Sequence, residues 1–114
     1  MLPKENRLKK RKDFESVFRK GKGFKEDFLV LKKNKNNLNQ SRFGFLVGGR
    51  VSKKATIRNK IRRRLSSLVQ KKLAKIKPGI DVIFIVQPGL ENKNFAQIER
   101  TIDRLFQTAK VIKC

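Results

Sequence analysis

The sequence predicts a single α+β domain, and three observations support this. Its 114 residues suit one hydrophobic core. Hydrophobic residues make up 38 % of the chain and include nine Phe, more than a disordered basic tail would carry. Segments with a helical period are interspersed with short strand-like runs. We therefore expect residues 1–114 to form one domain, in which residues 1–10 carry no core pattern and could be flexible.

A short helix is expected near the N-terminus, over residues 13–20. Asp13 is placed to cap its first turn. Phe14, Val17 and Phe18 recur at the spacing of one helical face, which predicts an apolar side.

Two strands are expected next, over residues 28–31 and 43–47. The Asn-rich, polar residues 32–41 between them predict a turn or loop. Phe24 could belong to a further strand or only to the approach.

The second half of the chain predicts a long helix, a buried strand and a last helix. The long helix is expected over residues 54–76, and its apolar stripe is Ile57, Ile61, Leu65, Leu68, Val69, Leu73 and Ile76. Residues 80–86 are nearly all apolar, which is typical of a strand covered on both faces. Asn94 is expected to cap the last helix. The buried stripe of that helix is expected to be Phe95, Ile98, Ile102, Leu105, Phe106 and Ala109.

Charge is the strongest indication of function. The chain has 31 Lys and Arg against 9 Asp and Glu, a formal net charge of +22. No carboxylate lies between Asp27 and Asp81, and eight basic residues fall within Arg50–Arg64. A folded surface normally mixes both signs, because like charges oppose compaction. A segment of one sign predicts a polyanionic partner, and the phosphates of nucleic acid fit best.

Basic residues of the long helix lie one turn apart, as with Arg58 and Arg62 or Lys60 and Arg64. A merely solvated face would interleave Glu with them. Physical reasoning leaves RNA and DNA open, because a rigid helix can enter the DNA major groove whereas RNA binders use shape, backbone and stacking.

Several functions are disfavoured by composition. There is no His, and the acids form no spaced cluster, so a protein active site or metal centre is not expected. No apolar run is long enough for a membrane span. The single Cys114 cannot form an internal disulfide, and a cytoplasmic location is expected.

Residues 55–63, Ala-Thr-Ile-Arg-Asn-Lys-Ile-Arg-Arg, resemble the signature of the bacterial ribonuclease P protein component. Residues 8–14, with Val17, Phe18 and Gly21, resemble the opening helix of that family, and residues 42–47 resemble the strand before the signature. Residues 81–86 and the helix over residues 95–106 resemble its C-terminal part. The similarity spans nearly the whole chain.

The resemblance implies about four strands and three helices, with the basic helix in an unusual left-handed βαβ crossover, although a right-handed one is the rule. It implies a catalytic RNA subunit and precursor tRNA as partners, a protein that is monomeric when free, and Mg²⁺ held mainly by the RNA. The protein would promote maturation of tRNA 5′ ends without cutting by itself.

The resemblance also implies two sets of site residues. The set expected to bind the catalytic RNA is Arg50, Lys53, Lys54, Arg58, Asn59, Lys60, Arg62 and Arg63. The set expected to bind the 5′ leader is Lys9, Arg11, Phe14, Phe18 and Leu31. At least one of the two phenylalanines is expected to stack on a base, whereas Phe28 is expected in the core.

The sequence departs from the family pattern at three places. Leu31 stands where many relatives carry an aromatic residue, Gly48-Gly49 replaces more basic residues, and Lys60 replaces the commoner Arg. Two alternatives remain beside a ribonuclease P subunit: a structural ribosomal RNA binder and a DNA-compacting protein.

Overall fold

The computed structural model describes residues 2–113. Within that range the chain forms three α-helices, four strands and three short 3-10 turns. In chain order they are η1 (Lys4–Asn6), α1 (Arg11–Lys20), β1 (Lys22–Glu26), β2 (Leu29–Lys35), β3 (Arg42–Leu46), α2 (Ala55–Lys72), η2 (Leu73–Lys75), β4 (Ile80–Val86), η3 (Leu90–Asn92) and α3 (Phe95–Thr108). The predicted α+β class is confirmed, and Phe24 does lie in a strand of its own.

The four strands form one mixed sheet in the order β1-β2-β4-β3. β4 pairs with β2 in the antiparallel sense and with β3 in the parallel sense. This central position explains the nearly all-apolar run of residues 80–86, because both faces of β4 are covered by side chains.

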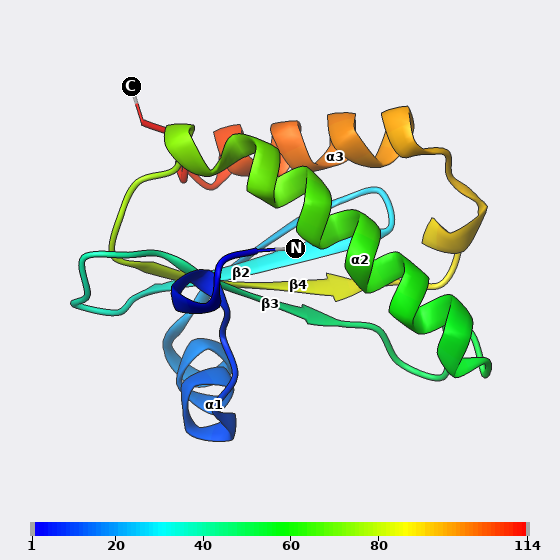
Figure 1. Cartoon of the computed structure of the whole chain (residues 1–114), viewed down its shortest axis with the longest axis horizontal. Coiled ribbons are helices and arrows are strands. Elements are labelled where there is room, and N and C mark those ends of the chain that lie inside the picture. Colours follow the sequence, from blue (N-terminus) through cyan, green and yellow to red (C-terminus); the bar gives the residue numbers. More distant parts are fainter. Residues whose placement is uncertain (1, 114) are drawn as a thin grey trace.

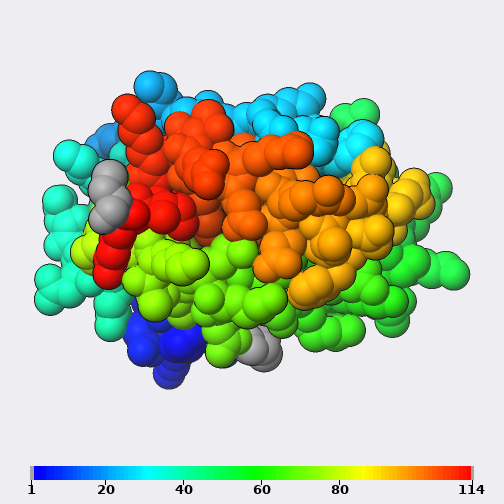
Figure 2. All heavy atoms as spheres, turned by 90° about the horizontal axis from the view of Figure 1, so that it is seen from above, coloured from blue at the N-terminus to red at the C-terminus, as the bar shows by residue number. Residues whose placement is uncertain are grey.

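The parallel strands β3 and β4 are joined through α2 in a βαβ crossover. Figure 1 shows β3 and β4 pointing the same way with α2 in front of them, and Figure 2, seen from above, places α2 on the side that faces the viewer of Figure 1. Seen from that side with the strands pointing up, β4 lies to the left of β3, so the crossover is left-handed. The resemblance implied this hand, whereas strand and helix patterns alone favour the opposite one.

Helices cover the two faces of the sheet unequally (Figure 1). α2 and α3 lie together over one face, and α1 crosses part of the other. The main core lies under α2 and α3, and its large buried members include Leu31, Phe43, Leu65, Phe84 and Phe106. A smaller cluster of Leu8, Val17 and Ile83 lies under α1. The remainder of the second face is left without a covering helix.

Residues 2–10 pack against the domain. Leu2 and Leu8 are buried, and the Leu8 backbone N–H donates to the carbonyl of Phe43 at 2.9 Å. This contact places the N-terminal segment along the outer edge of β3, because Arg7 and Phe43 form a parallel bridge.

Three predicted boundaries were wrong. The long helix expected over residues 54–76 ends as α2 at Lys72 and is followed by the 3-10 turn η2, Leu73–Lys75. Asp13 does not cap α1: the helix begins at Arg11, Lys10 is its N-cap residue, and the Asp13 carboxylate accepts from Arg42 Nη1 at 3.2 Å. The predicted loop over residues 32–41 begins too early, because β2 continues to Lys35. Its register with β4, which ends at the pair Lys35 and Ile80, is a long-range interaction that local composition does not reveal.

The last helix begins as predicted. The Asn94 side chain accepts from the Gln97 backbone N–H at 2.8 Å, and the Gln97 side chain accepts from the Asn94 N–H at 3.0 Å. Phe95, however, is 42 % exposed and does not join the buried stripe, which begins at Ile98. Phe95 is the first helical residue, and its ring lies beside Lys71 Nζ, 6.0 Å from the ring centroid.

We expect Asn94→Ala to lower the free energy of unfolding by about 1 kcal/mol, because the reciprocal cap is lost. Urea unfolding measures this change. Asn94→Asp, which retains an acceptor at the same position, serves as the control. Equal stability of the Ala variant and the unaltered chain would show that the cap contributes nothing.

Candidate nucleic-acid interface

The N-terminal half of α2 presents a basic surface opposite its buried stripe. Ile61, Leu65, Leu68 and Val69 pack into the core, as the 3.6-residue period requires. Its exposed amide and basic side chains are Asn59, Lys60 and Arg63, and the preceding loop adds the exposed Arg50, Lys53 and Lys54. We call these six residues the signature surface.

Two arginines of the predicted set have partners within the chain. Arg58 Nη1 donates to the carbonyl of Ser52 at 2.9 Å, and Arg62 Nη2 donates to the carbonyl of Val47 at 3.3 Å. Both side chains thereby hold the loop after β3 against α2. Because a guanidinium has five N–H donors, each keeps donors for a phosphate.

Asn59 is also partly engaged. Its side-chain oxygen accepts from Arg62 Nη1 at 2.7 Å. The sequence suggested that this amide could both donate and accept at RNA. The acceptor is used internally, so the NH₂ group is the part that faces a partner.

Gly48 and Gly49 lie exposed at the start of the same loop. A Cβ at either position would meet no atom within 4 Å, and neither residue has a positive φ. The fold itself therefore does not require glycine here.

The positive charge of this region is uncompensated. Within residues 2–113, no Lys or Arg between Arg50 and Arg64 forms a salt bridge with a carboxylate. Four of the nine acids lie in two clusters elsewhere: Asp13 and Asp81 around Arg42, and Glu99 and Asp103 around Lys72. Like charges without counter-ions repel, so a phosphate backbone lying alongside would relieve this repulsion.

The first of these acidic sites is centred on Arg42. Its guanidinium binds both oxygens of Asp81, at 2.8 and 2.7 Å, and Asp13 at 3.2 Å. Hydrogen bonding to Asp81 raises the pKa of Arg42 despite its burial. The cluster ties α1 to β3 and β4.

The second site joins α2 to α3 through Lys72, which lies 2.8 Å from Asp103 and 3.2 Å from Glu99. Burial alone would lower the pKa of Lys72, but its hydrogen bonds to Asp103 and Glu99 raise it. The hydrogen bond from Lys72 also lowers the pKa of Glu99.

The uncovered part of the sheet forms a second candidate surface, which we call the open sheet face. It comprises Phe18 at the rim of α1 and the strand residues Lys25, Val30, Lys32, Leu46 and Ile85. Phe18 is 39 % exposed, and Lys32 Nζ lies 5.2 Å from its ring centroid. An accessible aromatic ring beside an ammonium group can stack a base and contact a phosphate.

The sequence prediction missed Lys32, Val30 and Ile85 on this face. The signal was present in β2, where Leu29 and Leu31 point inward, so their neighbours Val30 and Lys32 must point outward. Residue 32 was assigned to a loop, and the alternation was therefore not followed.

Leu31 was predicted to contact the leader, and this prediction was wrong. Leu31 is fully buried in the main core, on the side of the sheet that α2 and α3 cover. Strand alternation places it on the opposite face from Lys32 and Phe18.

The remaining leader candidates lie near the N-terminus. Phe14 is half-buried and packs against Gly44, where an added Cβ would lie 2.5 Å from the ring. Lys9 is exposed. Arg11 is exposed and pairs with Glu15 at 3.1 Å, a contact that solvent screens strongly.

A cavity of about 270 Å³ at the edge of β3 brings the two predicted sets together. Lys9 and Phe14 line it from the N-terminal segment and α1, and Arg62 and Arg63 line it from α2. The leader and catalytic-RNA candidates are therefore neighbours in space, although about fifty residues separate them in the chain.

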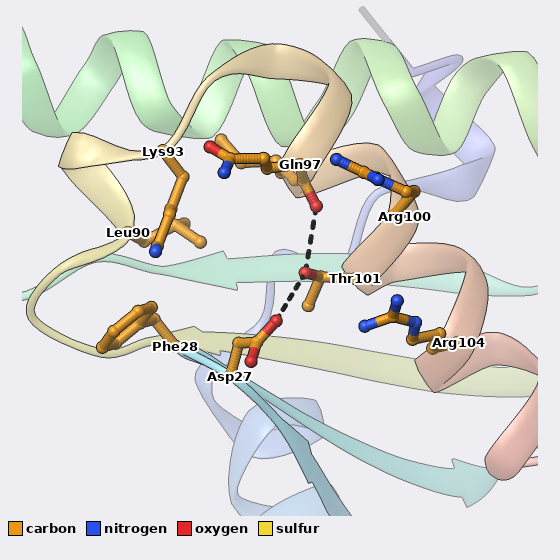
Figure 3. Close-up of a pocket in the computed structure, with 9 residues that line it drawn as sticks. Asp27, Phe28, Leu90, Lys93, Gln97, Arg100, Thr101 and Arg104 are labelled. Atoms are coloured by element: carbon orange, nitrogen blue, oxygen red, sulfur yellow. Dashed lines mark hydrogen bonds between the residues drawn. The ribbon is translucent and has the colours of Figure 1, made fainter.

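Phe28 lies in the β1–β2 turn, packs against the core and also lines a surface cavity of about 240 Å³. Figure 3 shows its ring facing Lys93, whose Nζ lies 4.9 Å from the ring centroid, with Arg100 and Arg104 across the cavity. Its predicted core position is therefore only partly correct.

The described residues, 2–113, contain no group of three His, Cys, Asp or Glu side chains able to hold a metal ion. Cys114 lies outside them. No helix in the described part of the chain is long and apolar enough to cross a membrane.

Together these features define a small, basic α+β protein with two surfaces suited to RNA, one on α2 and one on the opposite face of the sheet. The sequence model of the Ribonuclease P family matches residues 2–110 of this chain. The ribonuclease P protein component of Synechocystis sp. is 37 % identical over 112 residues, covering 97 % of this chain and 90 % of the relative. That of Clostridium botulinum strain 657 is 34 % identical over 109 residues, covering 95 % and 97 %.

Solved structures agree. The Staphylococcus aureus RNase P protein matches with a TM-score of 0.87 at 25 % identity, covering 95 % of this chain and 98 % of that one. The Thermotoga maritima RNase P protein matches with a TM-score of 0.82 at 27 % identity, covering 90 % and 96 %. The chain belongs to the ribonuclease P protein family, and it is a protein component of the ribonucleoprotein endonuclease that processes tRNA. This membership decides between the three nucleic-acid-binding alternatives that the charge left open.

Proposed function

We propose that this chain uses the signature surface, with Arg58 and Arg62 behind it, to bind the catalytic RNA subunit, and the open sheet face to bind the 5′ leader of precursor tRNA. The single observation that carries the proposal is the uncompensated charge on α2. It lies on the other side of the sheet from a separate surface that carries an exposed aromatic ring.

The two surfaces would act through different physical interactions. Exposed Lys and Arg on α2 bind phosphates and release counter-ions, which gives affinity that depends steeply on salt. Phe18 offers a stacking platform for an unpaired base, and Lys32 lies close enough to contact the adjoining phosphate. The leader would thus be fixed relative to the catalytic RNA, which favours the correct phosphodiester for hydrolysis.

We assign the bond-breaking step to the RNA. The paired acids of this chain do not fit a magnesium site, because Asp13 and Asp81 bind Arg42 while Glu99 and Asp103 bind Lys72. Mg²⁺ prefers carboxylate, phosphate and water oxygens, and the phosphates of the RNA supply them.

We further propose a cytoplasmic protein that is monomeric when free. A net charge of +22 disfavours self-association. The outer strand β1 also carries Lys22 and Lys25, and charged edge strands resist pairing with a second copy.

Reconstitution with a bacterial catalytic RNA and precursor tRNA tests the proposal. The protein alone, freed of RNA by nuclease treatment, should cleave nothing, and adding it to the RNA at low magnesium should promote leader removal. Unchanged cleavage and unchanged substrate affinity of the RNA would contradict it.

Phe18→Ala should weaken binding of precursor tRNA by the holoenzyme by about 1–3 kcal/mol, because one stacked base is lost. Its salt dependence should change little, since no phosphate contact is removed. Phe95→Ala is the matched control, because Phe95 is equally exposed but lies on α3. If both variants bind a tRNA with a leader equally well, Phe18 does not contact the leader.

A further inference from the structure

Six lysines gather at one end of the molecule, away from the signature surface. They line a cavity of about 420 Å³ together with Asn34 and Ile80. We call them the lysine pocket: Lys20, Lys22, Lys33, Lys35, Lys77 and Lys110. They come from the end of α1, the antiparallel strands β1 and β2, the approach to β4 and the segment just beyond α3. Figure 1 places the end of β2, the start of β4 and the end of α3 on the same side of the molecule.

The pocket has no counter-charge of its own. Within residues 2–113, none of the six ammonium groups forms a salt bridge, and no carboxylate lines the cavity. The acid nearest in register is Asp81, the strand partner of Asn34. Asp81 is buried and bound to Arg42, so it does not neutralise the pocket.

The fold holds these charges together at a cost. Burial, and then repulsion from Lys77, Lys22, Lys110 and Lys35, lowers the pKa of Lys33. The Nζ atoms of Lys22 and Lys33 also lie near the same aromatic ring, 5.9 and 6.0 Å from the ring centroid of Phe24. An ammonium is a compact point charge that suits phosphate oxygens, whereas the pocket offers no forked guanidinium for base edges.

We propose that the lysine pocket is a third RNA contact, which binds phosphate groups of an RNA strand. This inference rests on the proposed function, because it assigns a further part of the same ribonucleoprotein to this end of the protein. Two sources supply the same chemistry: the backbone of the catalytic RNA, and the distal part of a long leader that extends beyond the open sheet face. The lysines would bind either without reading its sequence.

The test is a pair of charge-neutralising variants with equal charge loss. Lys35→Gln with Lys110→Gln removes two exposed lysines of the pocket, and Lys93→Gln with Arg100→Gln removes two cations near the other end of α3. Filter binding over a salt series first measures the affinity of each variant for the catalytic RNA alone. It then measures the affinity of each holoenzyme for precursor tRNAs with short and with long leaders. Thermal unfolding checks that both variants stay folded.

In the pocket variant the association constant should fall less steeply with salt. The magnitude of the slope of log K against log salt should decrease by up to ~1.4–1.8, which is ~0.7–0.9 for each of two lost phosphate contacts. At about 0.15 M salt this corresponds to a loss of roughly tenfold or more in affinity. Loss in binding to the catalytic RNA alone identifies that RNA as the ligand. Loss only with the long leader identifies the leader. The variant at Lys93 and Arg100 should leave both slopes unchanged.

Equal effects of the two variants, or no effect of the pocket variant in either assay, would overturn the inference. A third protein, with Lys60→Ala and Arg63→Ala on the signature surface, separates this failure from that of the proposed function. If that protein loses affinity for the catalytic RNA while the pocket variant does not, the inference fails alone. If neither loses affinity, the proposed function fails as well.

Discussion

Replacing Asn59, Lys60 and Arg63 together by Ala should weaken binding to the catalytic RNA by at least an order of magnitude at about 0.15 M salt. Lys60 and Arg63 are exposed and have no carboxylate partner within residues 2–113, so each can neutralise a phosphate. The slope of log K against log salt should fall by up to ~1.4–1.8 for two lost contacts. Filter binding over a salt series measures both quantities.

A control with the same residue types is available. Asn39, Lys93 and Arg100 lie outside the signature surface and the open sheet face, and their replacement by Ala removes the same charge. If this control flattens the salt dependence as much as the first variant, net charge alone accounts for the affinity. The signature surface would then have no special role.

Single substitutions distinguish two roles of the basic residues in α2, binding RNA and holding the preceding loop. Arg58 and Arg62 donate to carbonyls of the loop after β3. We therefore expect Arg58→Ala to loosen that loop as well as to remove a charge. Hydrogen exchange of the loop amides would rise in Arg58→Ala and stay unchanged in Lys60→Ala.

Arg42→Met should lower the free energy of unfolding by about 3–5 kcal/mol. The Asp81 side chain is only 8 % exposed and would lose two charge-assisted hydrogen bonds, which leaves a buried charge without a cation. Because small domains have only about 5–15 kcal/mol of stability, part of the population should unfold. Urea unfolding, with sulfate present to offset the repulsion of the basic surface, measures the change.

Two further variants show whether the buried charge is the cause. Asp13→Ala should cost less, because this carboxylate is 26 % exposed and contacts Arg42 once, at 3.2 Å. Adding Asp81→Asn to Arg42→Met should restore part of the stability, since the unpaired charge is removed. A loss below about 1 kcal/mol for Arg42→Met would show that the cluster contributes no more than a surface ion pair.

Local patterns were sufficient for most of the elements. The 3.6-residue stripe of α2 and the capping signal of Asn94 describe interactions within one segment, so they were predicted correctly. The errors occurred where contacts between segments distant in the sequence determine the local structure. β2 extends through Lys35 because β4 pairs with it, and Asp13 turns to Arg42 of β3 instead of capping α1.

The candidate site shows the same division. The uncompensated charge of residues 50–64 and the aromatic pattern of α1 were visible in the chain, as was the family signature. The opposite positions of Leu31 and Lys32 follow from strand alternation, but only once β2 is known to extend past residue 31, and its pairing with β1 and β4 decides that extent.

By itself, the sequence determined the fold class, the buried stripes apart from Phe95, and the need for a polyanionic partner, because these follow from residue type and local period. Only the tertiary structure decided which cations are free and which are engaged. Arg58 and Arg62 donate to carbonyls of the loop before α2, while Lys60 and Arg63 face outward without a carboxylate partner within residues 2–113. It also brought the lysine pocket together from five separate segments, since like charges that are far apart in the chain become neighbours only when the sheet and α3 have packed.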